Sequence, residues 1–429
     1  MKDTRLTLDM SSYRENSCEP ISRFTGFFGD WEEKTLGEVG LFIRGLSYNK
    51  GEVTTNESST LVIRSNNIIQ DGVVDCKNGL QFVTKAPSTE QILKKGDIVI
   101  CLSNGSGNLV GKSASFDGDY SGVATVGAFC GIYRSSAPIT KYLVQTRAYK
   151  KSIDLIKQGG NGALANLYGR DILDLKFLFP SLAEQQKIAE CLDAADQMIS
   201  AQEQKVESLK SHKKGLMQQL FPQPGETTPR LRFPGFTDEW VEKPLSDVFT
   251  RLTRKNIENN QNVLTISAQY GLISQLDFFK KSVAAADVTG YYLLSKGDFA
   301  YNKSSSQGRP VGAIKPLKLY DKGVVSTLYI CFRCNNPKEI DFWEQYFDAG
   351  LLDKEIMTIA QEGARNHGLL NIPTSGFFGL TVLSPSIDEQ LKIASCLSAL
   401  DDTIVAETNK LEALKAHKKG LMQQLFPNF

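Results

Sequence analysis

The sequence contains no hydrophobic run long enough to cross a membrane, which takes about 20 predominantly apolar residues. Its opening segment, MKDTRLTLDMSSYRENSCEP, lacks the apolar core of a secretory signal peptide. With 429 residues, 41% of them hydrophobic, the chain is long enough for two or three globular domains. We therefore expect a cytoplasmic protein that does not bind membranes.

Cysteine and histidine are also scarce. The eight cysteines are spread singly except for Cys331 and Cys334. This lone CxxC pair could hold zinc only with two further ligands, and His367 is the one histidine of that half outside the C-terminal repeat segment. We predict a strand with buried cysteines, without a metal or a disulfide framework.

Familiar catalytic signatures are missing. The chain has no HExxH, no G-x-S-x-G, no nucleotide-binding fingerprint and no N/D-P-P-Y/F tetrapeptide of the amino-methyltransferase type. The segment SNGSGNLVGKSAS around Lys112 is similar to a phosphate loop, but G-x-x-x-x-G-K-S needs a glycine where the chain has Ser106. We expect no catalytic activity and no cofactor in this chain alone.

The formal net charge of +1 conceals an uneven distribution. Basic residues outnumber acidic ones in residues 34–178 and 243–383, whereas the rest of the chain is acidic on balance. A polyanion would dock on the two basic stretches. Chance unevenness in a neutral protein explains the charge equally well.

What the sequence does contain is an internal repeat. The ten residues HKKGLMQQLF occur at 212–221 and again at 417–426. They end a longer ungapped match that begins at Ser181 in the first copy and at Ser386 in the second. A chain that repeats itself in this way predicts two equivalent structural units.

A second matching pair lies upstream of the first. RFTGFFGDWEEKTLGEV begins at Arg23, and RFPGFTDEWVEKPLSDV begins at Arg232. The residues between the matched segments differ, apart from echoes such as the KGD turns at Gly96 and Gly297. Shared ends around divergent middles predict a common scaffold that carries two different binding domains.

The segments that begin at Ser181 and Ser386 predict two long helices. Their apolar residues recur at alternating spacings of four and three, a heptad pattern typical of a left-handed coiled coil. A glutamate three residues after each serine, Glu184 or Glu389, predicts a capping box. The predicted seam residues are Ile188, Leu192, Ala195, Ile199, Gln202, Val206, Leu209, Lys213, Leu216 and Leu220, and their copies Ile393, Leu397, Leu400, Ile404, Glu407, Leu411, Leu414, Lys418, Leu421 and Leu425.

A heptad seam needs a partner helix. Pseudo-twofold symmetry between the repeats predicts that the two helices pair antiparallel, with Glu407 near Lys213 or Gln202 near Lys418. The alternative is that each helix packs on its own domain. A helix of this length, about 50 Å at 1.5 Å per residue, is suited to act as a spacer.

The divergent stretches 34–180 and 243–385 contain short strand-like runs separated by turn residues, typical of compact α+β domains. Short helices are expected over 139–156 and 341–359. Each stretch should also present a glycine-containing loop with polar side chains suited to phosphates and base edges. The polar residues of these loops are Ser103, Asn104, Ser106 and Asn108, and Lys303, Ser304, Gln307 and Arg309.

Taken together, these motifs resemble a specificity subunit of a Type I restriction-modification system. The match rests on the element from Arg232 to Trp240 and its Arg23 copy, the KGD turns and the two EQ-K-IA helices that end in HKKGLMQQLFP, and it covers nearly the whole chain. The resemblance implies two target-recognition domains that each read one half of a split DNA sequence, with an antiparallel coiled coil setting their separation. It also implies two modification subunits that methylate adenine, together with restriction subunits.

We therefore predict an α+β protein with a pseudo-twofold repeat, in which two globular target-recognition domains are joined by two long helices that form an antiparallel coiled coil. The predicted divisions are 1–33 (N-terminal arm and conserved motif), 34–180 (first recognition domain), 181–222 (central helix), 223–242 (linker and repeated motif), 243–385 (second recognition domain) and 386–427 (distal helix).

The predicted function is that of a non-catalytic subunit that binds a bipartite site on double-stranded DNA and confers specificity on an adenine methyltransferase and restriction complex. An alternative is a protein-interaction scaffold with two binding domains on a coiled-coil spacer, whose binding would be indifferent to salt. A self-contained DNA enzyme would need catalytic residues in the divergent stretches.

Candidate residues follow from this prediction. DNA-binding candidates in the divergent stretches are Lys112, Arg134, Lys150, Lys151, Arg254, Lys303, Gln307, Arg309 and Arg365. Partner-binding candidates on the outward side of the helices are Glu184, Gln185, Lys187, Glu389, Gln390 and Lys392.

Overall fold

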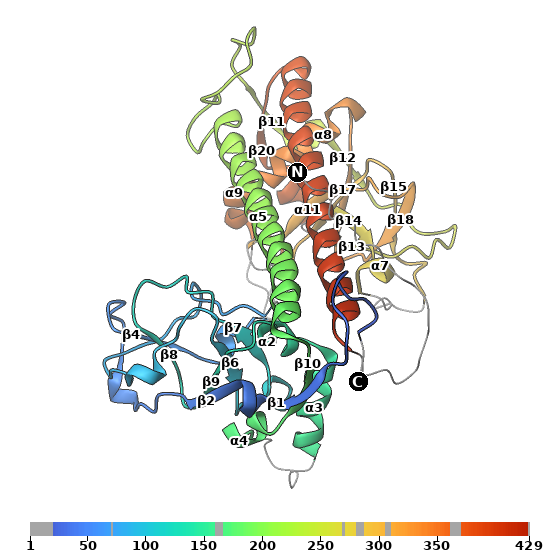
Figure 1. The fold of residues 1–429 in the computed structure, drawn as a ribbon. Coiled ribbons are helices and arrows are strands. Elements are labelled where there is room, and N and C mark those ends of the chain that lie inside the picture. Colours follow the sequence, from blue (N-terminus) through green and yellow to red (C-terminus); the bar gives the residue numbers. More distant parts are fainter. Residues whose placement is uncertain are drawn as a thin grey trace. The chain divides into compact units, whose positions relative to one another are not determined.

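The chain forms two compact units (Figure 1). The computed structural model describes residues 20–69, 72–158, 166–267, 271–279, 287–304, 310–360 and 370–427. Unit 1 comprises Met1–Gln202 and Lys410–Phe429, and unit 2 comprises Glu203–Asn409. No helix in these described ranges is long and apolar enough to cross a bilayer.

Two helices of 39 residues each contribute to both units, α5 (Leu182–Leu220) and α11 (Ile387–Leu425), green and red in Figure 1. Unit 1 holds the first part of α5 with the last part of α11, and unit 2 holds the remaining parts. All predicted seam residues of both helices are buried or half-buried, as the heptad pattern predicts.

Within unit 2 the two helices run antiparallel. Lys205 Nζ lies 2.5 Å from Glu407 Oε1, and Lys213 Nζ lies 2.6 Å from Asp401 Oδ1. The residue number on α11 falls as the number on α5 rises, which defines the antiparallel direction. The predicted pairing of Lys213 with Glu407 is therefore wrong, because in this register Asp401 lies opposite Lys213.

Unit 1 contains the equivalent ion pair. Lys418 Nζ lies 2.5 Å from Asp196 Oδ1. Lys418 and Asp196 are the repeat copies of Lys213 and Asp401, so the same contact forms once in each unit. The expected partner of Lys418 was Gln202, and the structure gives Asp196 in its place.

Serine caps begin both long helices. The Ser181 hydroxyl accepts a hydrogen bond from the Glu184 backbone N–H at 3.4 Å, and Ser386 accepts from Glu389 in the same way at 3.4 Å. This is the first half of the predicted capping box. The second half of the predicted capping box, in which the backbone N–H of the serine donates to the glutamate carboxylate, is wrong.

The two glutamates bind arginines of the repeated RF motifs instead. Arg23 Nε and Nη2 donate to the two Glu184 carboxylate oxygens at 2.9 and 2.6 Å. Arg232 donates to Glu389 through the same atoms at 2.9 and 2.7 Å. A planar guanidinium satisfies both oxygens at once, which a single cap N–H cannot do.

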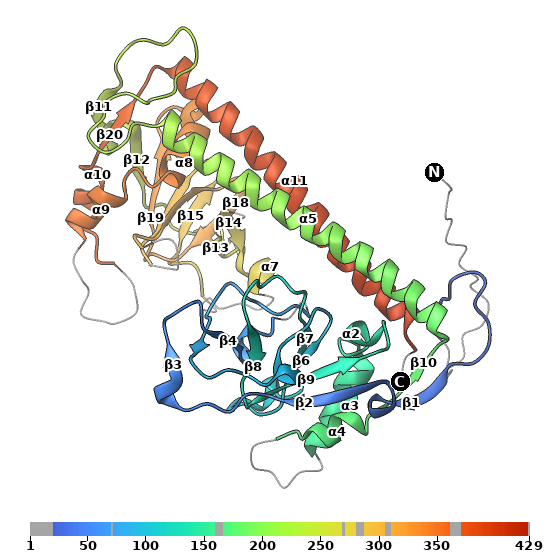
Figure 2. The same cartoon turned by 60° about the vertical axis from the view of Figure 1, so that its left-hand side comes forward.

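Unit 1 is built on a four-stranded antiparallel sheet in the order β2-β9-β6-β7 (Figure 2). A second sheet has the order β3-β5-β4-β8, with β4 and β8 parallel, and β1 pairs with β10. The strands are β1 Glu32–Thr35, β2 Gly40–Arg44, β3 Val53–Thr54, β4 Thr60–Ile63, β5 Phe82–Val83, β6 Ile98–Cys101, β7 Ser113–Ser115, β8 Ala124–Val126, β9 Cys130–Ser135 and β10 Lys176–Phe179. The helices are α1 Leu36–Val39, α2 Thr140–Leu143, α3 Arg147–Gln158 and α4 Gly169–Leu173, with 3-10 turns at Lys50–Glu52, Ser65–Asn67, Thr89–Gln91 and Gly107–Leu109.

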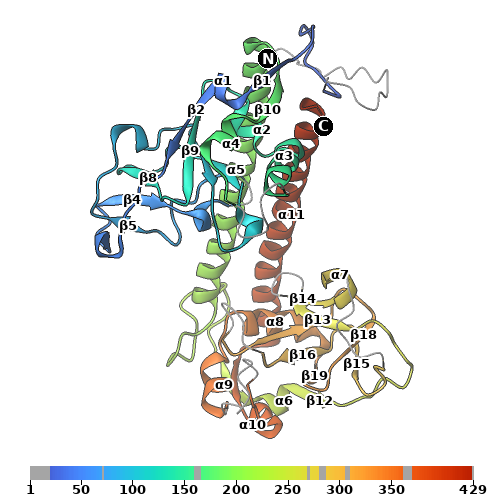
Figure 3. The same cartoon turned by 90° about the horizontal axis from the view of Figure 1, so that it is seen from below.

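Unit 2 repeats this plan, with a four-stranded sheet in the order β12-β19-β16-β17. Strands β12, β19 and β16 of this sheet are labelled in Figure 3. Helix α8 packs against β17. Three further strand pairs are β11-β20, β13-β14 and β15-β18. The strands are β11 Val241–Pro244, β12 Phe249–Leu252, β13 Leu264–Ser267, β14 Gly271–Ser274, β15 Tyr292–Ser295, β16 Phe299–Asn302, β17 Ala313–Pro316, β18 Lys322–Val325, β19 Ile330–Cys334 and β20 Thr381–Ser384. The helices are α6 Leu245–Val248, α7 Gln275–Phe279, α8 Ile340–Asp348, α9 Asp353–Ile359 and α10 Thr374–Phe378, with a 3-10 turn at Pro337–Glu339.

Each unit mixes strands and helices, which confirms the predicted α+β class. The KGD turns open the equivalent strands β6 and β16. Gly96 and Gly297 both have a φ of +90°, in the left-handed region that favours glycine. The sequence echo between these turns thus marks a shared backbone feature in two domains whose other residues differ.

The identical HKKGLMQQLF segments are explained by what their ends bury. Phe221 is buried in unit 2, where its ring centroid lies 6.3 Å from that of Trp240 at an interplanar angle of 90°. Phe426 is buried in unit 1, in one core cluster with Trp31. Each copy therefore lies in one core cluster with the tryptophan of a repeated upstream motif.

Two details of the predicted secondary structure need correction. The helix expected over 139–156 is broken into α2 and α3, because the Thr146 hydroxyl accepts from the Tyr149 N–H at 3.2 Å and starts a new helix. The helix expected over 341–359 is broken into α8 and α9 at Gly350, whose φ is +74°. Cys331 and Cys334 are buried thiols on β19, so the predicted strand is confirmed.

Candidate nucleic-acid interface

The glycine-containing loop of unit 1 opens from one edge of the four-stranded sheet. Strand β6 is antiparallel to both neighbours, so its carboxyl end lies beside the amino ends of β7 and β9. Cys101 N donates to Lys112 O at 2.9 Å, and Leu102 N donates to Phe129 O at 2.8 Å. Leu167 N donates to Leu102 O at 2.9 Å. Three loops thus meet where β6 ends.

The same edge is formed in unit 2. Strand pairing sets Asn302, the last residue of β16, opposite Ala313, and sets Tyr301 opposite Ile330. Leu370 N donates to Lys303 O at 3.0 Å, the counterpart of the Leu167 contact in unit 1. We call these surfaces the loop edges. Their described residues are 102–112, 127–130 and 166–168 in unit 1, and 302–304, 310–313, 326–329 and 370–371 in unit 2.

The loop around Lys112 is not a phosphate loop. Such a loop leads into a helix whose first N–H groups bind the phosphate, whereas this one passes through a single 3-10 turn into strand β7. Asn104 shapes it by accepting from the Ser106 N–H at 2.9 Å and donating to the Ser65 hydroxyl at 2.7 Å. The loop therefore presents polar groups on a held backbone.

Of the three predicted lysines of unit 1, one lies at the loop edge. Lys112 is half-buried at the loop edge, and Lys150 and Lys151 are exposed on α3. The end of α3 lies against the loop, where Lys157 Nζ is 3.2 Å from the Val110 carbonyl oxygen. Sequence reasoning missed Lys157, although helical spacing places it two turns after Lys150.

Arg134 is the exception and leaves the candidate set. It lies near the far end of β9, where its guanidinium donates to both Asp97 carboxylate oxygens at 2.7 and 2.6 Å. Asp97 is the buried aspartate of the KGD turn, and Arg333 binds Asp298 in the same way in unit 2. These arginines bind the aspartates of the KGD turns.

The unit 2 candidates Arg254 and Lys303 differ in environment. Arg254 is exposed, and its Nη2 donates to the Ser295 hydroxyl at 2.8 Å. Lys303 is half-buried at the loop edge, and burial lowers the pKa of its amine. The predicted residues Gln307, Arg309 and Arg365 lie outside the described residues.

Four of the six predicted partner-binding residues are not on an outward face. Glu184 and Glu389 are 1% exposed and bind the motif arginines. Gln185 and Gln390 are also buried, and their amides donate to the carbonyl oxygens of the prolines that precede the helices. The prediction is wrong for these residues, because sequence periodicity cannot show which face the RF motif covers.

Lys187 and Lys392 are exposed as predicted. The first turns of the same two helices also expose two apolar residues that are copies of each other, Leu182 and Ile387. An exposed apolar residue five positions before an exposed lysine recurs in both copies. This combination replaces the buried glutamates and glutamines as the candidate partner surface.

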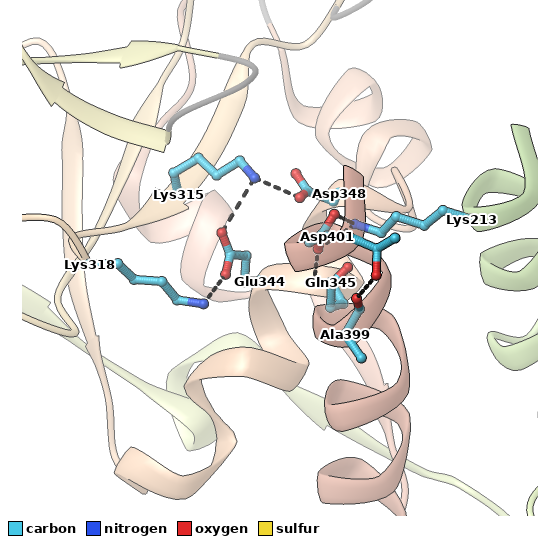
Figure 4. Close-up of polar contacts among 9 residues, drawn as sticks. Lys213, Lys315, Lys318, Glu344, Gln345, Asp348, Ala399 and Asp401 are labelled. Atoms are coloured by element: carbon cyan, nitrogen blue, oxygen red, sulfur yellow. Dashed lines mark hydrogen bonds and ion pairs between the residues drawn. The ribbon is translucent and has the colours of Figure 1, made fainter. Parts of the chain in front are cut away.

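A polar cluster joins α8 to the long helices within unit 2 (Figure 4). Gln345 Nε2 donates to Asp401 Oδ2 at 2.7 Å, and Lys213 Nζ lies within 2.7 Å of both Asp401 oxygens. Nearby, the buried Lys315 amine lies 2.6 Å from Asp348. These contacts fix the domain onto the helix pair, since buried charges are stable only when paired.

Unit 1 uses different residues for the same purpose. The Tyr142 hydroxyl of α2 donates to Asp196 Oδ2 at 2.9 Å, and Lys418 Nζ lies 5.2 Å from the Tyr142 ring centroid. The seam aspartate and lysine are therefore repeated, whereas the domain side chain that binds them is not. Sequence spacing placed Lys418 at the seam but did not identify Tyr142 or Asp196 as its partners.

An open groove of about 1490 Å³ lies beside the polar cluster of unit 2. A small-molecule site usually encloses roughly 300–1,000 Å³, so the groove is larger than a typical cofactor site. Its lining mixes lysines with carboxylates from α5, α8, α9 and α11. Within the described ranges, no three His, Cys, Asp or Glu side chains come together as metal ligands.

Comparison with known proteins agrees with this geometry. The family model of the Type I restriction modification DNA specificity domain matches residues 29–211. The StySPI specificity subunit of a Type I restriction enzyme from Salmonella potsdam is 31% identical over 186 residues, covering 42% of this chain and 39% of that protein. The EcoKI specificity subunit from Escherichia coli (strain K12) is 28% identical over 235 residues, covering 53% of this chain and 48% of that protein. The chain therefore spans less than half the length of these curated relatives.

The fold has a solved counterpart. The Type-I restriction-modification system S subunit from M. genitalium superposes with a TM-score of 0.56 at 12% identity, covering 96% of this chain and 100% of that chain. At this identity the likeness concerns the fold alone. The family model and both curated relatives agree that this chain is similar to Type I restriction-modification specificity subunits.

Proposed function

We propose that this chain is a DNA-sequence-recognition subunit that binds a bipartite target. Residues 34–180 and 243–385 each read one half of the site through their loop edges. The observation that carries the proposal is that one backbone frame presents different side chains at the two equivalent edges. Lys112 and Lys303 supply phosphate contacts that fix position, while neighbouring loop residues contact bases.

The helices of segments 181–222 and 386–427 act as an antiparallel spacer between the two readers. A helix of 39 residues is about 58 Å long at 1.5 Å per residue. Half-sites on one face of a duplex recur about every 34–36 Å. The helices therefore have enough length to span one helical turn of DNA and to attach a domain at each end.

Two copies of an adenine methyltransferase subunit bind the repeated first turns of the helices, and restriction subunits join that complex. The support is the duplicated surface of Leu182 with Lys187 and Ile387 with Lys392. Duplicated surfaces bind two copies of one partner. The chain itself contributes recognition and leaves the chemistry to these partners.

The direct test is to co-express the chain with the methyltransferase subunit encoded beside it and to map modified adenines across the host genome. We expect one split motif with two fixed halves. Affinity for that motif should also fall steeply as salt rises, because phosphate contacts release counterions. Adenine modification by the purified chain alone, or binding that ignores salt, would overturn the proposal.

A further inference from the structure

In each loop edge, the turn before β9 or β19 carries a large apolar side chain that projects into solvent. Phe129 in unit 1 is 70% exposed, and Leu328 in unit 2 is 57% exposed. Phe129 lies in the turn that leads into β9, which pairs with β6, and Leu328 lies in the turn that leads into β19, which pairs with β16. An isolated exposed apolar residue is common, but its recurrence at one position in two divergent domains calls for a reason.

Strand register establishes that the two positions are equivalent. Cys101 pairs with Cys130 in unit 1, which sets Phe129 opposite Leu102. Tyr301 pairs with Ile330 in unit 2, and continuing that register sets Leu328 opposite Lys303. The equivalent local sequences, VGAFC at 126–130 and VSTLY at 325–329, share only their first valine, so the sequence alone does not reveal this equivalence.

Both turns are held rigidly. The Phe129 carbonyl accepts from the N–H groups of Leu102 and Ser103 at 2.8 and 3.2 Å. In unit 2, the Leu328 N–H donates to the Ser326 hydroxyl at 3.3 Å, and the Tyr329 N–H donates to the Ser326 carbonyl at 3.1 Å. A side chain on a fixed turn loses little conformational entropy when it binds, so its contact is available for recognition.

The neighbouring groups point to DNA as the occupant. Lys112 and Phe129 both hydrogen-bond through their carbonyls to the end of β6, so a cation and an aromatic ring share that edge. In unit 2, the half-buried Lys303 amine lies in register opposite Leu328. A duplex offers phosphates to the cation, and base edges with thymine C5-methyl groups to the apolar side chain.

We propose that Phe129 and Leu328 are base-contacting residues that determine specificity, each packing against the base edges of its own half-site. This inference rests on the proposed function and deepens it. The differing shapes of the ring and the branched alkyl chain then favour different bases at equivalent positions of the two halves. Apolar groups read thymine mainly through its methyl group, so at least one affected position should prefer a T·A pair.

The test uses the full chain co-expressed with its methyltransferase subunit. Phe129→Ala should relax one or two base positions in one half of the motif and leave the other half unchanged. Leu328→Ala should do the same in the opposite half. The expected loss of discrimination at an affected position is about 5- to 150-fold, the range for one lost base contact.

Matched controls separate this effect from loss of any exposed apolar group. Phe28→Ala removes an 89% exposed ring from the RF motif of unit 1, and Leu319→Ala removes a 56% exposed side chain beyond β17, at the other edge of the sheet. Both controls should keep the wild-type motif. The conservative exchanges Phe129→Leu and Leu328→Phe retain apolar bulk, and they should alter base preference with methyltransferase co-purification intact.

The outcomes divide clearly. An unchanged motif and unchanged occupancy in both alanine variants would overturn the inference while leaving the proposed function standing. Uniform loss in both halves with intact co-purification would overturn it too, since it indicates a general contact. Failure of the wild-type complex to modify any split motif would instead refute the proposed function. Where an alanine variant fails to fold, the conservative exchanges decide the question.

Discussion

Replacing Arg232 by alanine should destabilise unit 2 sharply. The Arg232 guanidinium donates to both Glu389 carboxylate oxygens at 2.9 and 2.7 Å, and the Glu389 side chain is 2% exposed. Removing the arginine leaves a buried carboxylate without its counter-charge, which costs roughly 3–5 kcal/mol. In a domain of about 200 residues, a loss of 3 kcal/mol lowers Tm by roughly 6–12 °C.

The assay is calorimetric or denaturant unfolding of the full chain, with Arg230→Ala as the control. Arg230 also forms an ion pair, with Glu226, but both side chains are solvent-accessible, so its loss should cost at most about 1 kcal/mol. Adding Glu389→Met to the Arg232→Ala variant should recover part of the stability, because no buried charge is then left unpaired. The reasoning fails if Arg232→Ala costs no more than Arg230→Ala.

Three further outcomes are expected. Arg134→Ala should lower Tm by loosening the KGD turn at Asp97 without altering the modified DNA motif, so a changed motif would contradict its structural role. Lys303→Gln should reduce the slope of log affinity for DNA against log salt concentration by about 1. Because burial lowers the pKa of Lys303, its positive charge and the DNA affinity of the wild-type protein should fall as pH rises through that pKa. Lys303→Arg should remove this pH dependence. Phe221→Ala should cost about 3–5 kcal/mol of unfolding free energy in unit 2, and Phe426→Ala should do so in unit 1, each measured by domain-resolved hydrogen exchange.

Local periodicity made a large part of the fold predictable. The heptad residues are covered along both helices, as their spacing predicts, because burial in a helix follows a fixed repeat. The serine caps and the strand that carries Cys331 also followed from local signals. These features depend on residues only a few positions apart in the chain, so they can be predicted directly from the sequence.

Predictions failed where a distant residue competed with a local one. Glu184 had the spacing for a capping box, yet its carboxylate binds Arg23, 161 residues earlier in the chain. The paired guanidinium donors outcompete one backbone N–H, and no periodic pattern records that competition. Arg134 is a similar case, because the sequence alone does not distinguish an arginine on the surface from one that pairs with a buried carboxylate, here Asp97.

By itself, the sequence determined that the chain is doubled, that each copy ends in a heptad helix, and that two divergent α+β stretches lie between shared segments. Only the tertiary structure decided which side chains meet at each loop edge. Strand pairing brings Phe129 beside Leu102 and Leu328 into the equivalent place, through hydrogen bonds between residues far apart in the chain. Sheet register depends on such long-range pairing, which is why the equivalence of the two readers appears in the backbone and not in their residues.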